Sequence, residues 1–303
     1  MRGRVLLMGS VLAAIVVAVL TTVALLLVEP ELSTAEAIKT GGLAGGAVVA
    51  LYALWLNDRR RRTDEARHEL ESDKAADERF ARSVELLGNE ADQVRVGALH
   101  ALAWLADSTP RYQQTVFDVL CAYLRRPFTH PSYTRRADDP DQVTPDDSSD
   151  SSEADRERQV RLTAQRLITD LLPYGQNPDR SAYHLDLTGA SLEYFRLEGR
   201  RIGRLTVRRT RFYGTTRLSE VHASKPALFT GAAFLGRVDL REAQFEGGIS
   251  FQETVFSDEV AFKGASVSTF IDLNTTAPER QTGTLTITEG TKVKGDASRW
   301  ALA

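Results

Sequence analysis

Hydrophobic and polar positions divide the chain near residue 62: two long apolar stretches come before it, and charged residues are spread throughout the rest. Residues 5–28 contain no charged side chain, and as a helix rising about 1.5 Å per residue they reach roughly 36 Å. The second stretch, about 38–57, is uncharged from Thr40 onward. A bilayer core of about 30 Å needs about 20 apolar residues per helix, so the pattern predicts a transmembrane hairpin within residues 1–62.

Two other interpretations of the apolar stretches fit less well. A secretory signal peptide has an apolar core of about 7–15 residues that ends in a cleavage site of small residues, whereas Val28 is followed by Glu29, Pro30 and Glu31. A buried core helix would not explain four consecutive arginines, 59–62, directly after the second stretch. We therefore expect a lipid bilayer to surround both helices.

Charge at the ends of the hairpin predicts its orientation. Arg2 and Arg4 precede the first span and Arg59–Arg62 follow the second, while the connection carries three glutamates and one lysine. Because basic residues are enriched on the cytoplasmic side, both termini are expected in the cytoplasm of a multi-pass protein of the cell membrane. The spans carry no charge in their interior, so an anchor is favoured over a channel.

Small residues recur at four-residue spacing within the hairpin. Gly41 and Gly45 form one such pair on the second span, Gly42 and Gly46 form another, and Gly9 with Ala13 gives the same spacing on the first. This spacing lets helix backbones approach closely in lipid, so the helices are expected to pack on each other or on a second copy of the chain. Glycine that is merely tolerated is the alternative.

Residues 63–128 change from a charged, solvated stalk to helical amphipathic periodicity. Three stripes of apolar residues at helical spacing predict a small antiparallel bundle. The stripes are Phe80, Val84 and Leu87; Val94, Ala98, Leu102 and Leu105; and Val116, Phe117, Leu120, Cys121 and Leu124. Cys121, the single cysteine of the chain, lies on the third stripe and is expected to be a buried structural thiol.

An acidic segment follows the bundle. Residues 137–155 hold eight acidic residues and no Lys or Arg, which predicts a disordered linker over 129–156, because such a composition buries too little apolar surface to order the chain. Helical spacing returns over 157–173, and this helix is expected to cover the first coil of the segment that follows.

From residue 185 onward the apolar residues recur every five or six positions. One run is Leu187, Leu192, Leu197, Ile202, Val207 and Phe212, and a second is Phe229, Phe234, Leu240, Phe245, Phe251, Phe256, Phe262 and Val267. Neither an α-helix nor an ordinary strand has this period, and a fixed period of this kind is typical of a solenoid.

These repeats resemble the pentapeptide-repeat proteins. The resemblance is carried by LDLTGASLEYFRL at 185–197 and by 227–267, where a central Leu or Phe follows two places after a small or apolar residue. It implies a right-handed quadrilateral β-helix over 185–270 with about four coils, closed by residues 271–303 as a cap or tail. Residues 198–226 match the repeat poorly, so a bulge or loop is expected around Pro226. Residues 78–125 also look like the helical module of bacterial membrane-anchored members.

The sequence offers no candidate catalytic, metal-binding or cofactor-binding residue. The five histidines show no metal-ligand spacing, one cysteine cannot form an intramolecular disulfide, and the motifs of serine hydrolases, phosphate-binding loops and zinc proteases do not occur. A membrane-tethered, non-catalytic scaffold or protein-interaction module is therefore expected, with an unidentified protein partner and a possible homo-oligomer. An uncharacterised enzyme is the less favoured alternative.

The resemblance suggests a further alternative, a DNA mimic that modulates type II topoisomerases, and the charge of the repeats argues against it. Residues 196–217 hold eight arginines against one glutamate, and 218–270 hold seven acids against four bases. An acid-covered rod is therefore not expected, and neither is direct contact with nucleic acid. The arginines could meet anionic lipid or an acidic partner, including the 137–155 segment itself, although a solvated face is the simpler interpretation.

Overall fold

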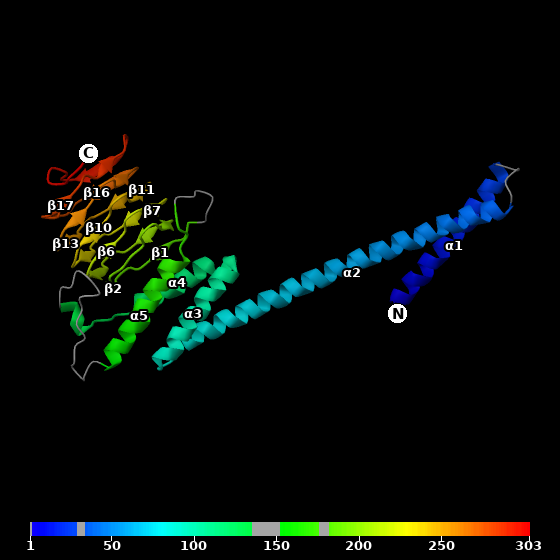
Figure 1. Cartoon of the computed structure of the whole chain (residues 1–303), viewed down its shortest axis with the longest axis horizontal. Helices are drawn as coiled ribbons and strands as arrows, with labels where there is room; N and C mark the ends of the chain where they lie inside the picture. Colours follow the sequence, from blue (N-terminus) through cyan, green and yellow to red (C-terminus); the bar gives the residue numbers. More distant parts are fainter. Residues whose placement is uncertain (1, 29–33, 135–151, 176–181) are drawn as a thin grey trace. The chain divides into compact units, whose positions relative to one another are not determined.

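The computed structural model describes residues 2–28, 34–134, 152–175 and 182–303. The chain divides into two compact units, Met1–Ala75 and Ala76–Ala303. The helix α2 (Thr34–Leu86) contributes to both units (Figure 1).

The first unit contains α1 (Arg2–Val28) and most of α2. Each helix holds a window long and apolar enough to cross a membrane, Gly9–Val28 in α1 and Thr34–Arg59 in α2. The large apolar side chains of these windows point outward; Leu12 is 66% exposed and Leu43 is 75% exposed. Such a surface is unfavourable in water and suits a hydrocarbon environment.

Small residues form the contact between α1 and α2. A Cβ added at Gly45 would lie 2.9 Å from the carbonyl oxygen of Ala14, and one at Gly41 would overlap the hydroxyl of Thr22. A Cβ added at Gly42 or Gly46 would meet no atom within 4 Å. The prediction that the two helices pack on each other through four-residue spacing is therefore confirmed for Gly41 and Gly45.

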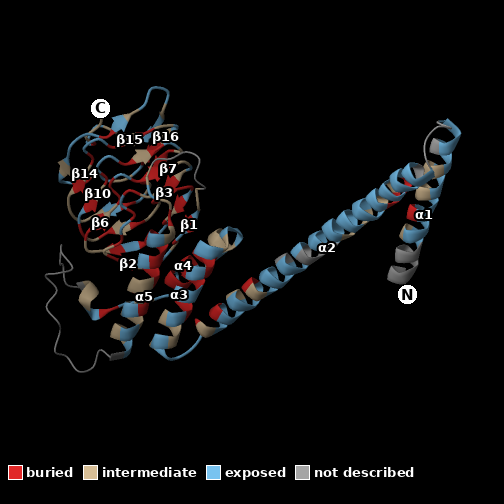
Figure 2. Cartoon of the chain, turned by 45° about the vertical axis from the view of Figure 1, so that its right-hand side comes forward, coloured by how far each residue is buried: buried red, intermediate tan, exposed pale blue. Residues whose placement is uncertain are grey.

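The helices of the second unit pack around one apolar core. They are the end of α2, α3 (Asp92–Ser108), the 3₁₀ helices η1 (Pro110–Tyr112) and η2 (Pro131–Thr134), α4 (Gln113–Leu124) and α5 (Ser152–Leu171). Leu102, Phe117 and Ile168 are fully buried where α3, α4 and α5 meet, as the red inner faces of these helices show in Figure 2. Most of the apolar residues expected in stripes on α3 and α4 face this core, and Cys121 is 2% exposed as predicted.

The segment expected as a linker is partly helical. Pro131–Thr134 forms η2, and α5 begins at Ser152, five residues before the expected start, and ends at Leu171. Glu153 and Asp155 stand in the first turn of α5, where acidic side chains are stabilised by the helix dipole. The same acidic composition that predicted disorder is thus favourable at a helix start. The remainder of the expected linker, 135–151, lies outside the described residues.

A four-sided solenoid of about five coils forms the rest of the unit (Figure 1). All of its paired strands run parallel, and each side is one sheet. The first side consists of β1 (Leu185–Asp186), β4 (Leu205–Thr206), β8 (Ala227–Leu228), β12 (Ile249–Ser250), β16 (Phe270–Leu273) and β19 (Lys292–Gly295). The second side consists of β2 (Ser191–Glu193), β5 (Arg211–Tyr213), β9 (Ala233–Phe234) and β13 (Val255–Phe256).

The chain then turns to the two remaining sides before it returns to the first. The third side consists of β6 (Thr216–Arg217), β10 (Val238–Asp239), β14 (Val260–Ala261) and β17 (Gln281–Thr282). The fourth side consists of β3 (Arg201–Ile202), β7 (His222–Ala223), β11 (Gln244–Phe245), β15 (Ser266–Val267) and β18 (Thr286–Ile287). This arrangement confirms the predicted β-solenoid.

Stacked aromatic rings fill the solenoid. On the second side the ring centroids of Phe212 and Phe234 are 4.6 Å apart, and those of Phe234 and Phe256 are 5.4 Å apart. Phe229 and Phe251 form a parallel stack at 5.5 Å. Because each coil places its central residue above that of the coil before, the repeats share one continuous core.

Residues 198–226 form regular coils, and the expected irregularity around Pro226 is limited to one extra residue at a corner: Ile202 and Leu205 are three residues apart, while their partners Ala223 and Ala227 are four apart. The strands β3 to β7 pair with their neighbours in register, and Pro226 accepts an ordinary bond from the backbone N–H of Leu205 at 3.3 Å. The inward positions are continued by Leu218 and Ala223, both buried. The side chain of Ala223 is small, which is why the period seemed to be interrupted in the sequence.

The solenoid also extends beyond its expected end. The strands β16 to β19 add to the preceding coil in parallel, so much of 271–303 continues the solenoid. The cap itself is short: the Trp300 ring lies over the stack, 5.5 Å from the Phe251 ring and 6.0 Å from the Phe256 ring. The backbone of Ala301 and Ala303 forms hydrogen bonds with the backbone of Leu285 and Ile287, at and beside β18.

The other end of the solenoid is covered by helices. The fork of Arg158 on α5 binds the Glu193 carboxylate at 2.7 and 2.5 Å, and both side chains are largely buried. Arg125, after α4, binds Asp186 at 2.7 Å. These contacts hold α5 and α4 against the first coil, in the position that the sequence analysis expected for a covering helix.

Candidate functional site

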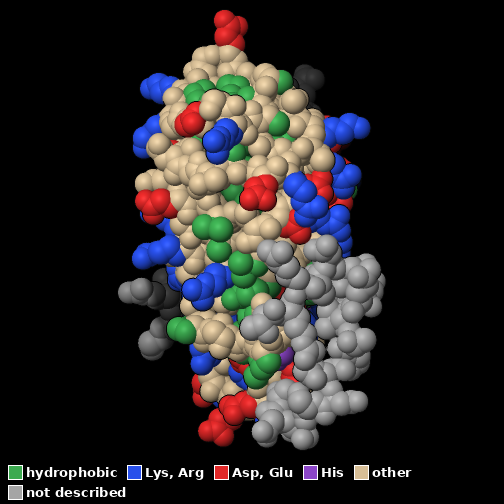
Figure 3. All heavy atoms as spheres, turned by 90° about the vertical axis from the view of Figure 1, so that its left-hand side faces the viewer, with side chains coloured by type: hydrophobic (Ala, Val, Ile, Leu, Met, Phe, Trp, Pro, Cys, Tyr) green, Lys and Arg blue, Asp and Glu red, His purple; other side chains and the backbone are tan. Residues whose placement is uncertain are grey.

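The eight arginines of 196–217 do not share one face. This segment makes roughly one coil, so its residues are distributed around the solenoid: Arg211 lies on the second side, Arg217 on the third and Arg201 on the fourth. Arg200 donates to the Leu172 carbonyl at 3.0 Å, and Arg201 is buried beside His222. In Figure 3 basic side chains accordingly lie along both margins of the solenoid, with acidic ones among them.

The third side gathers arginines that are distant in the sequence. Strand pairing aligns one outward position of successive coils into a column, which we call the third-side column: Arg196, Arg217, Asp239, Ala261 and Thr282. Neighbouring strands in a sheet are about 4.8 Å apart, so side chains in such a column touch or nearly touch. The column therefore begins with two adjacent positive charges.

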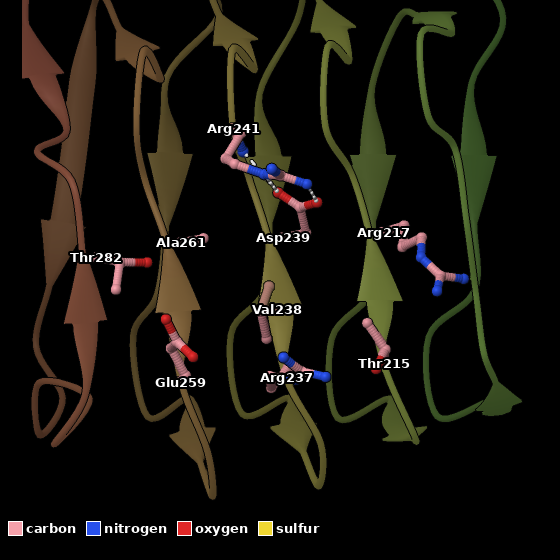
Figure 4. A pocket seen from close by; sticks show the side chains of 9 residues that line it. All are labelled: Thr215, Arg217, Arg237, Val238, Asp239, Arg241, Glu259, Ala261 and Thr282. Carbon is pink, nitrogen blue, oxygen red and sulfur yellow. Dashed lines mark hydrogen bonds and ion pairs between the residues drawn. The ribbon is translucent and has the colours of Figure 1, made fainter. Parts of the chain in front are cut away.

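A shallow groove of about 400 Å³ follows this side (Figure 4). Three arginines and two acidic residues are among the side chains that line it. The lining residues are Thr215, Arg217, Arg237, Val238, Asp239, Arg241, Glu259, Ala261 and Thr282.

Asp239 and Arg241 form a closed pair within the groove. The Arg241 guanidinium donates to both carboxylate oxygens of Asp239, at 2.9 and 2.7 Å, as the dashed lines in Figure 4 show. Burial by itself would raise the pKa of Asp239, but the hydrogen bonds from Arg241, with the positive charges of Arg241 and Arg217, hold that pKa below its usual value. Asp239 is thus charged at neutral pH, and its acceptor capacity is largely used within the chain.

Arg196 and Arg217 have no comparable partner. Within the part of the chain that the structure describes, neither guanidinium makes an ion pair. In Figure 4 the Arg217 side chain extends away from Asp239 toward the preceding coil. Like charges opposite each other on neighbouring strands destabilise a sheet, so this pair lowers the stability of the solenoid when nothing is bound.

A second, larger hollow of about 700 Å³ lies among the helices. Arg95 pairs there with Glu157 and donates to the Tyr123 hydroxyl at 3.2 Å. Burial, followed by the charge of Glu157, raises the pKa of Tyr123 to about 12, so the hydroxyl stays protonated and donates to Glu157 at 3.1 Å. These contacts on one wall of the hollow join α3, α4 and α5, while the buried Nε of Arg95 has no hydrogen-bond partner among the described residues.

One group of side chains resembles a nucleophilic triad. Ser132 Oγ lies 2.6 Å from His130 Nδ1, and His130 Nε2 lies 2.7 Å from Asp155 Oδ1. However, the backbone N–H of Ser132 also donates to Nδ1, at 3.1 Å, so the nitrogen that would accept the serine proton is already engaged. The group fastens the η2 turn to the start of α5. The sequence carries no signal of this group, because His130 and Asp155 are 25 residues apart and both lie in the segment expected as a linker.

Cofactor and metal chemistry find little support in the described ranges. No group of three or more His, Cys, Asp or Glu is placed there to share a metal ion. The Cys121 thiol is buried, and burial raises its pKa from 9.0 to about 12, so the reactive thiolate is suppressed at neutral pH.

Comparison with known proteins agrees with the solenoid geometry. Residues 208–255 match the family model for pentapeptide repeats (9 copies). The match includes part of the region that the sequence analysis found irregular, and it lies within the regular coils of the structure. No curated protein and no solved structure matches the chain. The coils of residues 208–255 are thus similar to pentapeptide repeats, and β-solenoid proteins of this kind are generally non-enzymatic scaffolds.

Proposed function

We propose that this protein is a membrane-tethered, non-catalytic interaction module whose solenoid binds another protein. One observation carries the proposal: the interior of the solenoid is filled by its own side chains, while its third side carries a charged groove and two arginines that make no ion pair within the described residues. A filled solenoid offers its surface, and this surface has a defined charge pattern.

The tether is supported by the hairpin of the first unit. Two adjacent helices are long and apolar enough to span a bilayer, and small residues pack them closely together. The arginines at 59–62 and the acidic connection between the helices favour a cytoplasmic location for both termini. The solenoid would then meet only partners near the inner face of the membrane.

The charge of the solenoid does not favour the topoisomerase-type DNA mimic. A mimic of DNA needs a continuous row of negative charge, because the duplex carries one charge per about 1.7 Å of its axis. The third-side column instead starts with Arg196 and Arg217, and its one carboxylate, on Asp239, is neutralised by Arg241. A protein partner with both charged and uncharged contacts fits this surface better.

Affinity capture from detergent-solubilised membranes tests the proposal. The full chain is compared with a chain that ends after residue 174, and circular dichroism verifies that the helical unit of the shorter chain remains folded. We expect at least one protein to be recovered with the full chain alone. Recovery of the same proteins with both chains would contradict a binding role for the solenoid.

The orientation needs its own experiment. A tag placed after Ala303 should be cleaved by protease in inside-out vesicles and protected in intact cells. Cleavage of the tag on intact cells would overturn the proposed topology, while leaving the interaction role of the solenoid to be judged by the capture experiment.

A further inference from the structure

The first coils place two arginines on the third side, Arg196 and Arg217, that make no ion pair within the described residues. Arg196 and Arg217 are neighbours in the third-side column, and Arg237 lines the groove one coil further along. The nearest acid in the column, Asp239, is held on both of its oxygens by Arg241. The two column arginines therefore face solvent with donors that a carboxylate could accept from.

Arginine at this spacing suits carboxylates. Each guanidinium can donate two parallel hydrogen bonds to one carboxylate, and such charge-assisted bonds are about twice as strong as neutral ones. An incoming acidic side chain would also relieve the repulsion between Arg196 and Arg217. Binding at this position thus adds an attraction and removes an unfavourable contact.

The groove carries an acidic side chain toward the later coils, and this restricts the class of partner. Glu259 lines the groove, and within the described residues its carboxylate makes no ion pair. A uniformly anionic surface, such as a membrane or a nucleic-acid backbone, would place negative charge against Glu259 and Asp239. A polypeptide can place carboxylates at one end of the groove and an uncharged or basic residue at the other.

We propose that the third side of the solenoid is a docking site for an acidic segment of a partner protein, with Arg196 and Arg217 binding its carboxylates. This rests on the proposed interaction function and specifies its surface and its ligand. The groove that Arg217 and Asp239 line, about 400 Å³ in volume, admits side chains of the docked segment.

Peptide binding to the full chain in detergent tests the site. The probe is a fluorescein-labelled peptide of alternating Glu and Ser, and binding is followed by fluorescence anisotropy. The double variant Arg196→Gln, Arg217→Gln is compared with Arg204→Gln, Arg208→Gln. Arg204 and Arg208 are exposed, belong to the same sequence cluster and flank β4 on the first side of the solenoid, so the control removes the same charge from another side.

We expect the Arg196/Arg217 variant to bind the peptide about tenfold more weakly or worse, a loss of about 1.4 kcal/mol or more, and the control to change less than about twofold. Removing the repulsion between Arg196 and Arg217 should not destabilise the protein, so that variant should unfold at or slightly above the temperature of the unaltered protein, and the control at the same temperature. Equal weakening by the two variants would mean general charge attraction and would overturn the site.

Two further outcomes decide against an acidic segment. Vesicles containing phosphatidylserine that displace the peptide and depend on Arg196 and Arg217 would assign the surface to lipid instead. In the capture experiment, a partner that needs the solenoid but still binds the Arg196/Arg217 variant would leave the interaction function standing and refute this docking site. A partner lost in this variant and retained in the control would support both.

Discussion

The hairpin and the solenoid differ in the size of the side chains that they bury. Between α1 and α2 the buried positions are small, such as Gly41, Gly45 and Ala14, and the leucines point outward. In the solenoid the buried positions also include large side chains such as Phe234, beside small ones such as Ala232. The difference follows from the surroundings. In lipid, burying a leucine between helices brings no hydrophobic gain, so close backbone contact holds the helices, whereas in water the burial of large apolar side chains stabilises the core.

Phe234→Ala should give the largest effect on the solenoid side of this comparison. Phe234 is 1% exposed and stacks between Phe212 and Phe256, so its loss leaves a cavity that the coils cannot fill. We expect destabilisation by about 3–5 kcal/mol in denaturant unfolding of the detergent-purified protein. Val255→Ala on the same side of the solenoid is the control; Val255 is 56% exposed and should change stability by less than about 0.5 kcal/mol.

Trp300→Ala should have a smaller effect, because it uncovers the end of the stack and not its middle. Removing a ring that covers Phe251 and Phe256 should cost about 1.5–3 kcal/mol. Trp300→Phe should be much milder, since among the described residues the buried indole N–H has no hydrogen-bond partner to lose. Equal destabilisation by both variants in thermal melts would show that Trp300 acts through the indole N–H and not through stacking.

A disulfide trap tests the hairpin side of the comparison. A Cβ at position 45 would lie 3.1 Å from the Ala18 Cβ, slightly closer than in a disulfide, so Ala18→Cys with Gly45→Cys should cross-link in a Cys121→Ala background. Adding Gly41→Leu should lower the yield, because overpacking costs about 1–3 kcal/mol. Thiol counting with a maleimide measures both.

The matched control for the trap uses the outward glycines. Ala18→Cys with Gly46→Cys should not cross-link, and Gly42→Leu should leave the yield of the Ala18–Gly45 pair unchanged. Equal yields for positions 45 and 46 would mean that α1 and α2 do not have a fixed face toward each other.

Arg241→Ala should have the smallest effect. The Arg241 side chain is 59% exposed, and ion pairs at such positions contribute less than about 1 kcal/mol. Asp239 has a lowered pKa in the folded protein, so its contribution is present above the unfolded pKa of about 3.9 and is lost as the pH falls through the folded value. The difference between variant and unaltered protein should therefore be measurable at pH 7 and vanish in strong acid.

The hairpin contact and most of the solenoid could be predicted from local spacing in the sequence. The four-residue spacing of Gly41 and Gly45 and the five-residue spacing of the central Leu and Phe residues each describe one repeating environment. The spacing is not visible in the sequence where a small residue takes an inward position. Ala223 occupies a position that the neighbouring coils fill with Phe245 and Ile202. The spacing is also broken past residue 270, where the last coil lacks a second-side strand.

The candidate binding surface could not be found by the same means. The sequence showed arginines clustered over 196–217, but one coil spreads that cluster around all sides of the solenoid. Successive members of the column Arg196, Arg217 and Asp239 are one coil apart. Their alignment depends on the number of residues in each coil, which is not constant. Charge density along the chain and charge density on a face are separate quantities in a solenoid.

The covering ring of Trp300 has a consequence for the order of events during synthesis. The rings of Phe251 and Phe256 are made long before Trp300 leaves the ribosome, so each nascent chain passes through a stage with an open aromatic end and unpaired strand edges. Such ends are aggregation-prone. A nonsense mutation between Phe256 and Trp300 would make that stage permanent and should direct the chain to proteolysis, although every coil before it can form.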